Sequence, residues 1–149
     1  MGRLARFWAL PKREKEFLCE AGILLSLSHA CLKAIAFRHI ERFLRTRWPD
    51  GSQGGIDRQH EIRLAQRAIS RAANVLPWKS RCLSLSITEF IMLRRRGVPA
   101  IIFAGARFSG HSSLDAHAWV ETGLEVKDNS IENSGFATVL RIGSQAIDR

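Results

Sequence analysis

The sequence predicts an α+β fold in which helices come first and an antiparallel sheet follows. Apolar residues recur at helical spacing between Pro11 and Gly97, and the spacing changes to strand-like alternation after Gly97. Helices followed by strands in this order are typical of α+β proteins. The 149 residues, 46% of them hydrophobic, suit one domain with its own core. We therefore expect a single domain over 1–149, in which 1–48 form a helical lead-in and 77–149 form the catalytic core.

Two helices are expected in the N-terminal third, over residues 12–36 and 37–47. Pro11 suits the first turn of the first helix, because its ring holds a helical φ and the N–H that it lacks has no helical partner there. His29 and Lys33 interrupt the apolar run, which falls short of the roughly 20 apolar residues that a membrane span needs. We expect this helix to be buried, with contact at a membrane surface as the alternative, and without stable membrane insertion. Its predicted apolar stripe consists of Leu18, Ile23, Leu24, Leu25, Leu27 and Leu32.

Two more helices are expected before the sheet. Asp57 can cap a helix over 58–76, because its carboxylate can accept hydrogen bonds from the first free N–H groups. The next helix is predicted to begin near Ser80 and to end at Gly97, a residue type common at helix C-termini. The arginines at 94–96 are expected to be solvated at the negative end of this helix.

Four strands are expected after Gly97, and Thr122 and Gly123 are predicted to form the turn of a hairpin between the second and the third. The predicted strands cover residues 99–108, 115–122, 123–130 and 136–144.

The three cysteines are an odd number without a CxxC pair, which argues against a disulfide framework and against a zinc site. Cys82 falls in the first turn of the predicted fourth helix, where unpaired backbone N–H groups favour a thiolate. Lys79 and Arg81 add positive charge beside it. Cys19 and Cys31 fall mid-helix among apolar residues, where a thiol is usually a small inert packing group. Cys82 is therefore the candidate nucleophile.

A base and an orienting group follow Cys82 in the chain. His117 lies in the middle of a predicted strand, and the predicted hairpin brings Asp128 alongside it. A thiol, an imidazole and a carboxylate in this order can form an activated nucleophile with its base and the orienter of that base. The amide of Asn129 can orient a histidine as well, so Asp128 and Asn129 both remain candidates. The order of these residues is not specific by itself.

The sequence motifs around these residues are more specific than the order of the three residues. "SRCLSLS" (80–86), "LRRRGVPA" (93–100) and "AHAWVE" (116–121) followed by "GLEVKD" (123–128), with the helical lead-in "LARFWALPKREKEFLCEAGILL", resemble the leader peptidases of lasso-peptide biosynthesis. These are transglutaminase-like, papain-related cysteine peptidases, and the likeness is to their stand-alone form. It extends over about residues 3–130. The resemblance implies a papain/transglutaminase-like core with the nucleophile at a helix N-terminus, and a catalytic triad of Cys82, His117 and Asp128.

The resemblance also implies an activity and its partners. The expected function is a cysteine endopeptidase that removes the leader from a ribosomally made lasso precursor, without a cofactor or a metal. The implied partners are the precursor peptide, a small separate leader-recognition protein and the lasso cyclase. We expect the helical N-terminal third to be the docking surface. No secretion signal precedes the charged start, so the cytoplasm is the expected compartment.

Two other classes of function remain open. An acyltransferase of the transglutaminase type would use the same three residues, since the thioester chemistry is shared and only the acceptor differs. A non-catalytic basic binding module would account for the net charge of +9. It would leave "HAWVE" unexplained, and no nucleic-acid-binding motif is visible, so we expect no nucleic acid as partner.

Overall fold

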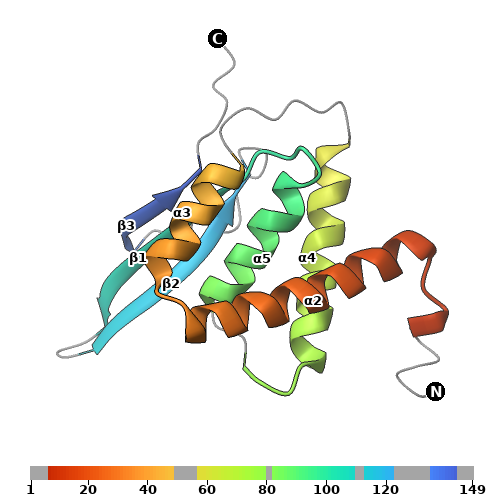
Figure 1. The fold of residues 1–149 in the computed structure, drawn as a ribbon, viewed down its shortest axis with the longest axis horizontal. Coiled ribbons are helices and arrows are strands. Elements are labelled where there is room, and N and C mark those ends of the chain that lie inside the picture. The colour runs from red at the N-terminus through yellow and green to blue at the C-terminus, as the bar shows by residue number, and fades with distance from the viewer. Residues whose placement is uncertain (1–6, 49–56, 80–81, 110–112, 123–134, 144–149) are drawn as a thin grey trace, which may run out of the picture.

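A computed structural model describes residues 7–48, 57–79, 82–109, 113–122 and 135–143 of the chain. In this part, four helices form a layer beside a three-stranded antiparallel sheet, which is contacted mainly by the helices over 37–47 and 82–94 (Figure 1). The helices are α2 (Lys12–Ala34), α3 (Phe37–Arg47), α4 (Arg58–Val75) and α5 (Cys82–Arg94), and the strands are β1 (Ile101–Ser109), β2 (Ser113–Glu121) and β3 (Ala137–Ile142). The predicted α+β fold is confirmed, and the helix boundaries agree with the sequence to within about two residues.

Helix α4 forms as its sequence predicts. Asp57 caps it, because the Asp57 carboxylate accepts a hydrogen bond of 3.2 Å from the backbone N–H of His60. Alanines and isoleucines at helical spacing then build a buried face. The buried apolar residues of α4 are Ile62, Leu64, Ala65, Ala68, Ile69 and Ala72.

Helix α2 crosses α4 and α5 and buries only a narrow side (Figure 1). Phe17, Ala21, Leu25 and Ser28 are buried at helical spacing, whereas the predicted stripe members Ile23 and Leu27 are exposed. Cys19 is exposed as well, so the prediction that it is a packing group is wrong. The reason is geometric: two residues after Phe17, a helical side chain points about 200° away from it.

By length and composition, α2 is the one described helix apolar enough to cross a membrane. Its buried residues nevertheless lie in the same hydrophobic core as those of α4 and α5. The helix is therefore part of the packed domain.

Helix α5 ends in the way that Gly97 predicts. Gly97 has a φ of +72°, a conformation that favours glycine, and Val98 N–H donates to the Leu93 carbonyl at 3.0 Å. The last turn differs from expectation at Arg94, which is 5% exposed rather than solvated. Its guanidinium donates to the Trp48 carbonyl at 3.2 Å, because the end of α3 lies against this turn.

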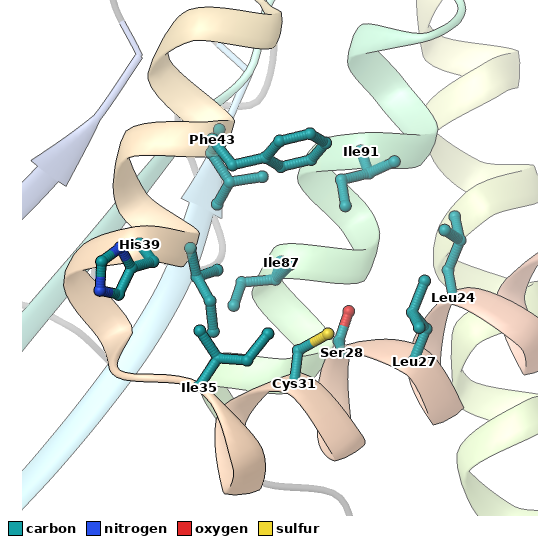
Figure 2. Close-up of a pocket in the computed structure, with 11 residues that line it drawn as sticks. Leu24, Leu27, Ser28, Cys31, Ile35, His39, Phe43, Ile87 and Ile91 are labelled. Atoms are coloured by element: carbon teal, nitrogen blue, oxygen red, sulfur yellow. The ribbon is translucent and has the colours of Figure 1, made fainter.

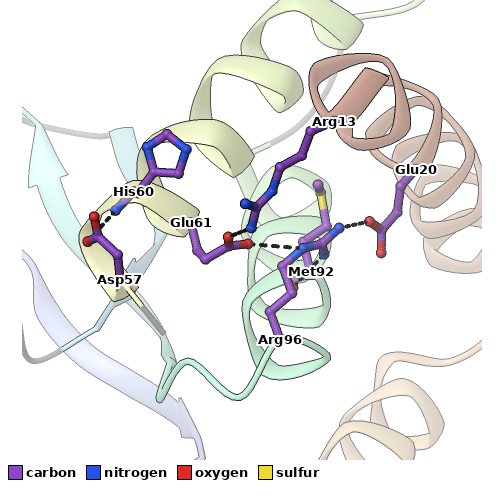
Figure 3. A network of polar contacts seen from close by, with 7 residues as sticks. All are labelled: Arg13, Glu20, Asp57, His60, Glu61, Met92 and Arg96. Atoms are coloured by element: carbon purple, nitrogen blue, oxygen red, sulfur yellow. Dashed lines mark hydrogen bonds and ion pairs between the residues drawn. The ribbon is translucent and has the colours of Figure 1, made fainter. Parts of the chain in front are cut away.

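A polar network ties the helices together (Figure 3). Glu61 of α4 is 2% exposed, and its carboxylate pairs with Arg13 of α2 and with Arg96, just past the end of α5. Arg96 also pairs with Glu20 of α2 and lies 3.9 Å above the centre of the Phe17 ring. Two arginines thus compensate the buried charge of Glu61, as a buried carboxylate requires.

The sheet has the order β2–β1–β3, and both pairings are antiparallel. Ile102, Val120 and Ile142 belong to the core that the helices share, so one face of the sheet packs on the helices. Side chains alternate along a strand, so His117 and Trp119 belong to the opposite face. The predicted strand over 123–130 and its hairpin turn at Gly123 lie outside the described residues.

Candidate active site

Cys82 is the first residue of α5, as the sequence predicts. Its side chain is partly buried. The first N–H groups of a helix have no partner within the helix, so they point toward the thiol region and favour negative charge there. Cys82 therefore combines partial access with a location at the start of a helix. The predicted cap residue Ser80 and its neighbour Arg81 lie outside the described residues.

The segment leading into α5 is held by an aromatic pair. The Trp78 ring stacks on the His29 ring of α2, with ring centres 5.2 Å apart and planes 20° apart. This contact fixes the chain four residues before Cys82. Helix α2 thereby helps to position the start of α5, which its sequence pattern did not reveal.

The start of α5 lies beside β2. The Cys82 Sγ is 4.0 Å from the carbonyl oxygen of Ala116, at the long limit of a hydrogen bond from a thiol. Ala116 precedes His117, so residues that are far apart in sequence meet at the predicted site. Between Cys82 and His117 themselves no side-chain hydrogen bond is formed. The structure therefore brings the Cys82 thiol to the main chain of β2 but not to the imidazole, which belongs to the face of the sheet away from the helices. Catalytic hydrogen bonds often form only when substrate binds.

His117 lies in a cluster of aromatic rings. Its imidazole stacks on Trp119, with ring centres 6.1 Å and planes 17° apart, and lies tilted against Phe136, with centres 5.6 Å apart. The indole N–H of Trp119 donates to the Glu121 carboxylate at 2.9 Å. The Glu121 carboxylate is therefore hydrogen-bonded to Trp119.

Phe136 is the residue of this site that sequence reasoning missed. It comes just before β3, and its ring reaches His117 although β1 separates the two strands. A usable signal was Gly105 in the middle of β1, because glycine inside a strand often marks a close approach of other groups. The predicted orienters Asp128 and Asn129 lie outside the described residues.

The structure also contains an apolar groove among α2, α3 and α5, with a volume of about 300 Å³ (Figure 2). Its floor includes Ile87 and Ile91 of α5, at least one turn beyond Cys82. Leu27 and Phe43 on its sides are 57% and 56% exposed. Apart from Ser28, Cys31 and His39 the lining of the groove is apolar, which suits contact with an apolar partner. The helical groove, as we call it, is lined by Leu24, Leu27, Ser28, Cys31, Ile35, His39, Ile40, Phe43, Leu44, Ile87 and Ile91.

Within the described ranges no three His, Cys, Asp or Glu side chains come together in a way that could hold a metal ion. Near the start of α5 the described residues place the Cys82 thiol beside the main chain of Ala116, which precedes His117.

A family model of the transglutaminase-like superfamily matches residues 24–141, which include α5, Cys82 and the whole of β2. The chain therefore belongs to the transglutaminase-like superfamily, which generally contains cysteine hydrolases and transferases. Its helices and antiparallel sheet are consistent with the core of that superfamily. Neither a curated protein nor a solved structure matches the chain significantly.

Proposed function

We propose that this chain is a cysteine endopeptidase that removes the leader from a lasso-peptide precursor. The observation that carries the proposal is the thiol of Cys82 at the start of α5, 4.0 Å from the main chain next to His117. Membership of the superfamily supports cysteine chemistry of the protease or acyltransferase type. The words "SRCLSLS" and "AHAWVE" support the finer assignment to leader removal.

In the proposed reaction, His117 takes the thiol proton and the Cys82 thiolate attacks the scissile carbonyl carbon. The C–N bond then breaks, and His117 gives the proton to the leaving amine. Water, deprotonated by His117, attacks the thioester and releases the leader, which restores the thiol. The N–H groups in the first turn of a helix have no partner within the helix, so those of α5 are suited to stabilise the oxyanion. Asp128 or Asn129 is proposed to orient the imidazole.

The proposal includes partners. A small leader-recognition protein would hold the leader and deliver the cleavage site to Cys82, and the freed core peptide would pass to the lasso cyclase. Two linked contacts raise the effective concentration at the site, so each can be modest. We propose the cytoplasm as the compartment, and the scheme needs neither a nucleic acid nor insertion into a membrane.

We propose the helical groove as the docking site of the recognition protein. Its exposed apolar side chains, such as Leu27 and Phe43, suit the apolar face of a partner helix. Exposed arginines on α3, at 38, 42 and 47, favour acidic side chains on that partner. A second copy of this chain fits less well, because it would bring its own net charge of +9 to the same surface.

The test is cleavage of the full precursor, with the recognition protein present, followed by mass spectrometry. Cys82→Ala and His117→Ala should each abolish cleavage, because they remove the nucleophile and its base. Asp128→Ala or Asn129→Ala should lose less, since an orienter is partly replaceable. Product masses separate hydrolysis, which adds water, from transfer to an amine.

Cys19→Ala and His60→Ala serve as matched controls, because both side chains are exposed on helices and lie outside both the Cys82 site and the helical groove. They should cleave at the wild-type rate. Circular dichroism must show that every variant is folded. Cleavage by a folded Cys82→Ala protein would exclude the peptidase assignment, and an amine adduct as the main product would favour the acyltransferase.

A further inference from the structure

Gly105 of β1 lies directly opposite His117 of β2, and it leaves room above the sheet. A Cβ atom at position 105 would lie 3.0 Å from the Phe136 Cβ and 3.3 Å from the Trp119 Cη2. Cβ atoms in proteins rarely come that close to other groups, so the two aromatic side chains occupy the space that a larger residue would need. The pairing of β1 with β3 also shifts register between Ala104 and Gly105.

Through this gap Phe136 reaches across β1. Neighbouring strands lie about 4.8 Å apart, so β3 is two strand spacings from β2. The Phe136 ring nevertheless lies 5.6 Å from the His117 ring and 6.4 Å from the Trp119 ring, measured between centres. The imidazole therefore contacts one ring from its own strand and one from the far side of β1.

Phe136 is itself held in place. The Arg107 guanidinium lies 4.5 Å from the centre of the Phe136 ring, and Arg107 Nε is 3.8 Å from the Asp115 carboxylate. Arg107 and Asp115 are paired across β1 and β2, one step along from the Gly105–His117 pair on the same face. The other charged groups of this face have partners of their own: Glu121 accepts from Trp119, and Arg141 lies over Phe103.

We propose that Phe136 is a positioning residue for His117: together with Trp119 it holds the imidazole in one orientation and limits the access of water to it. This inference rests on the proposed function, in which His117 exchanges a proton with Cys82. A ring packed against two aromatic neighbours has fewer orientations to lose when the proton is transferred, so it is the Cys82 side chain that turns toward it. Phe136 contacts the base and not the reacting atoms.

The test replaces Phe136 by leucine, which removes the ring and keeps an apolar side chain. Phe103→Leu is the matched control, since Phe103 stacks on Trp119 with ring centres 5.7 Å apart and lies under an arginine, as Phe136 does, without contacting His117. Two measurements apply to each folded variant. The first is kcat and KM for precursor cleavage, and the second is the rate at which iodoacetamide modifies Cys82 at neutral pH, without substrate.

Phe136→Leu should lower kcat by about tenfold or more and leave KM within about twofold, because orientation of the base matters in the transition state rather than in binding. Alkylation of Cys82 should slow toward the rate of His117→Ala. Phe136→Tyr should restore both rates, and Phe103→Leu should change neither. If Phe136→Leu does not fold, Phe136→Met supplies the same comparison.

The failures are distinguishable. If the wild-type protein cleaves the precursor and Phe136→Leu matches it in kcat and in alkylation, the positioning role is wrong and the proposed function stands. If Phe136→Leu and Phe103→Leu lose activity equally, the aromatic cluster is merely structural and the inference is overturned. If the wild-type protein neither cleaves the precursor nor alkylates faster at Cys82 than His117→Ala does, the proposed function fails and this inference fails with it.

Discussion

Two glycines of this chain have opposite surroundings at the scale of single residues. A Cβ at Gly105 would meet the Ala137 carbonyl oxygen and the Phe136 Cβ at 3.0 Å, whereas a Cβ at Gly22 in α2 would meet nothing within 4 Å. The first glycine is needed for close packing over the sheet. The second costs helix stability without serving a contact, because glycine is more flexible than alanine in the unfolded chain.

We predict opposite effects of alanine at these two positions. Gly105→Ala should lower the free energy of unfolding by about 1–3 kcal/mol, because backbone or rings must shift to admit the methyl group. Gly22→Ala should raise it by about 0.5–1 kcal/mol, since the helix interior favours alanine. Urea denaturation followed by circular dichroism measures both. A Gly105→Ala protein as stable as the wild type would mean that the aromatic rings do not pack as described.

The thiols show how location outweighs accessibility at this scale. Cys19 is the exposed cysteine, yet it lies within α2, whose helical N–H groups are already paired. Cys82 is less exposed but begins α5, where N–H groups are free to stabilise negative charge. The N–H groups of a helix start can also hold the oxyanion of an acyl intermediate, so we propose covalent chemistry at Cys82 rather than at Cys19.

At the scale of elements, α2, α4 and α5 are joined by charges as well as by apolar packing. Glu61 is the centre of this arrangement because it is buried and pairs with arginines from both neighbouring segments. Arg96 extends the network to Glu20 and covers the Phe17 ring. The network holds the end of α5 opposite to Cys82, so it fixes the helix that begins with Cys82.

Glu61→Ala should therefore lower the free energy of unfolding by about 1–3 kcal/mol, since it leaves Arg13 and Arg96 without their buried partner. Glu14→Ala is the matched control, because Glu14 pairs with Arg71 between the same two helices at 2.9 Å but in contact with solvent. That change should cost less than about 1 kcal/mol. Chemical denaturation of the two variants gives the comparison, and equal losses would contradict the special role of Glu61.

At the scale of the whole molecule, the helical groove and the site of Cys82 occupy different regions of the helical layer. The groove lies among α2, α3 and the later turns of α5, whereas Cys82 is the first residue of α5 (Figures 1 and 2). One surface can thus hold a partner while the other acts on a peptide. The net charge of +9 favours an acidic partner. Association with such a partner should slow as salt rises, because salt screens the charges.

We predict that Leu27→Glu and Phe43→Glu each raise the KM of partner-assisted cleavage by about tenfold, because a carboxylate in an apolar contact remains unpaired. Val75→Glu is the control, since Val75 is equally apolar and exposed but lies at the end of α4, outside the groove. Alkylation of Cys82 should be the same in all three. Raised salt should weaken partner binding to the wild type, and groove variants that behave like Val75→Glu would exclude the groove as docking site.

The sequence alone predicted much of this fold, for reasons that are local. Helices such as α4 and strands such as β2 follow from residue spacing, and their ends follow from Asp57 and Gly97, whose chemistry acts within a few residues. The same local logic located Cys82 at a helix start. Short sequence motifs indicate even the superfamily, and the family model that matches residues 24–141 agrees with them.

Only the tertiary structure decided which side chains meet. The positions of α4 and α5 determine which face of α2 is buried. The spacing of apolar residues therefore could not predict that Cys19 and Leu27 are exposed. Arg94 is buried because the end of α3 packs beside it, a contact between distant segments. Phe136 reaches His117 only because β3 pairs with β1 at Gly105. Such contacts arise from the packing of whole elements, which no local pattern records.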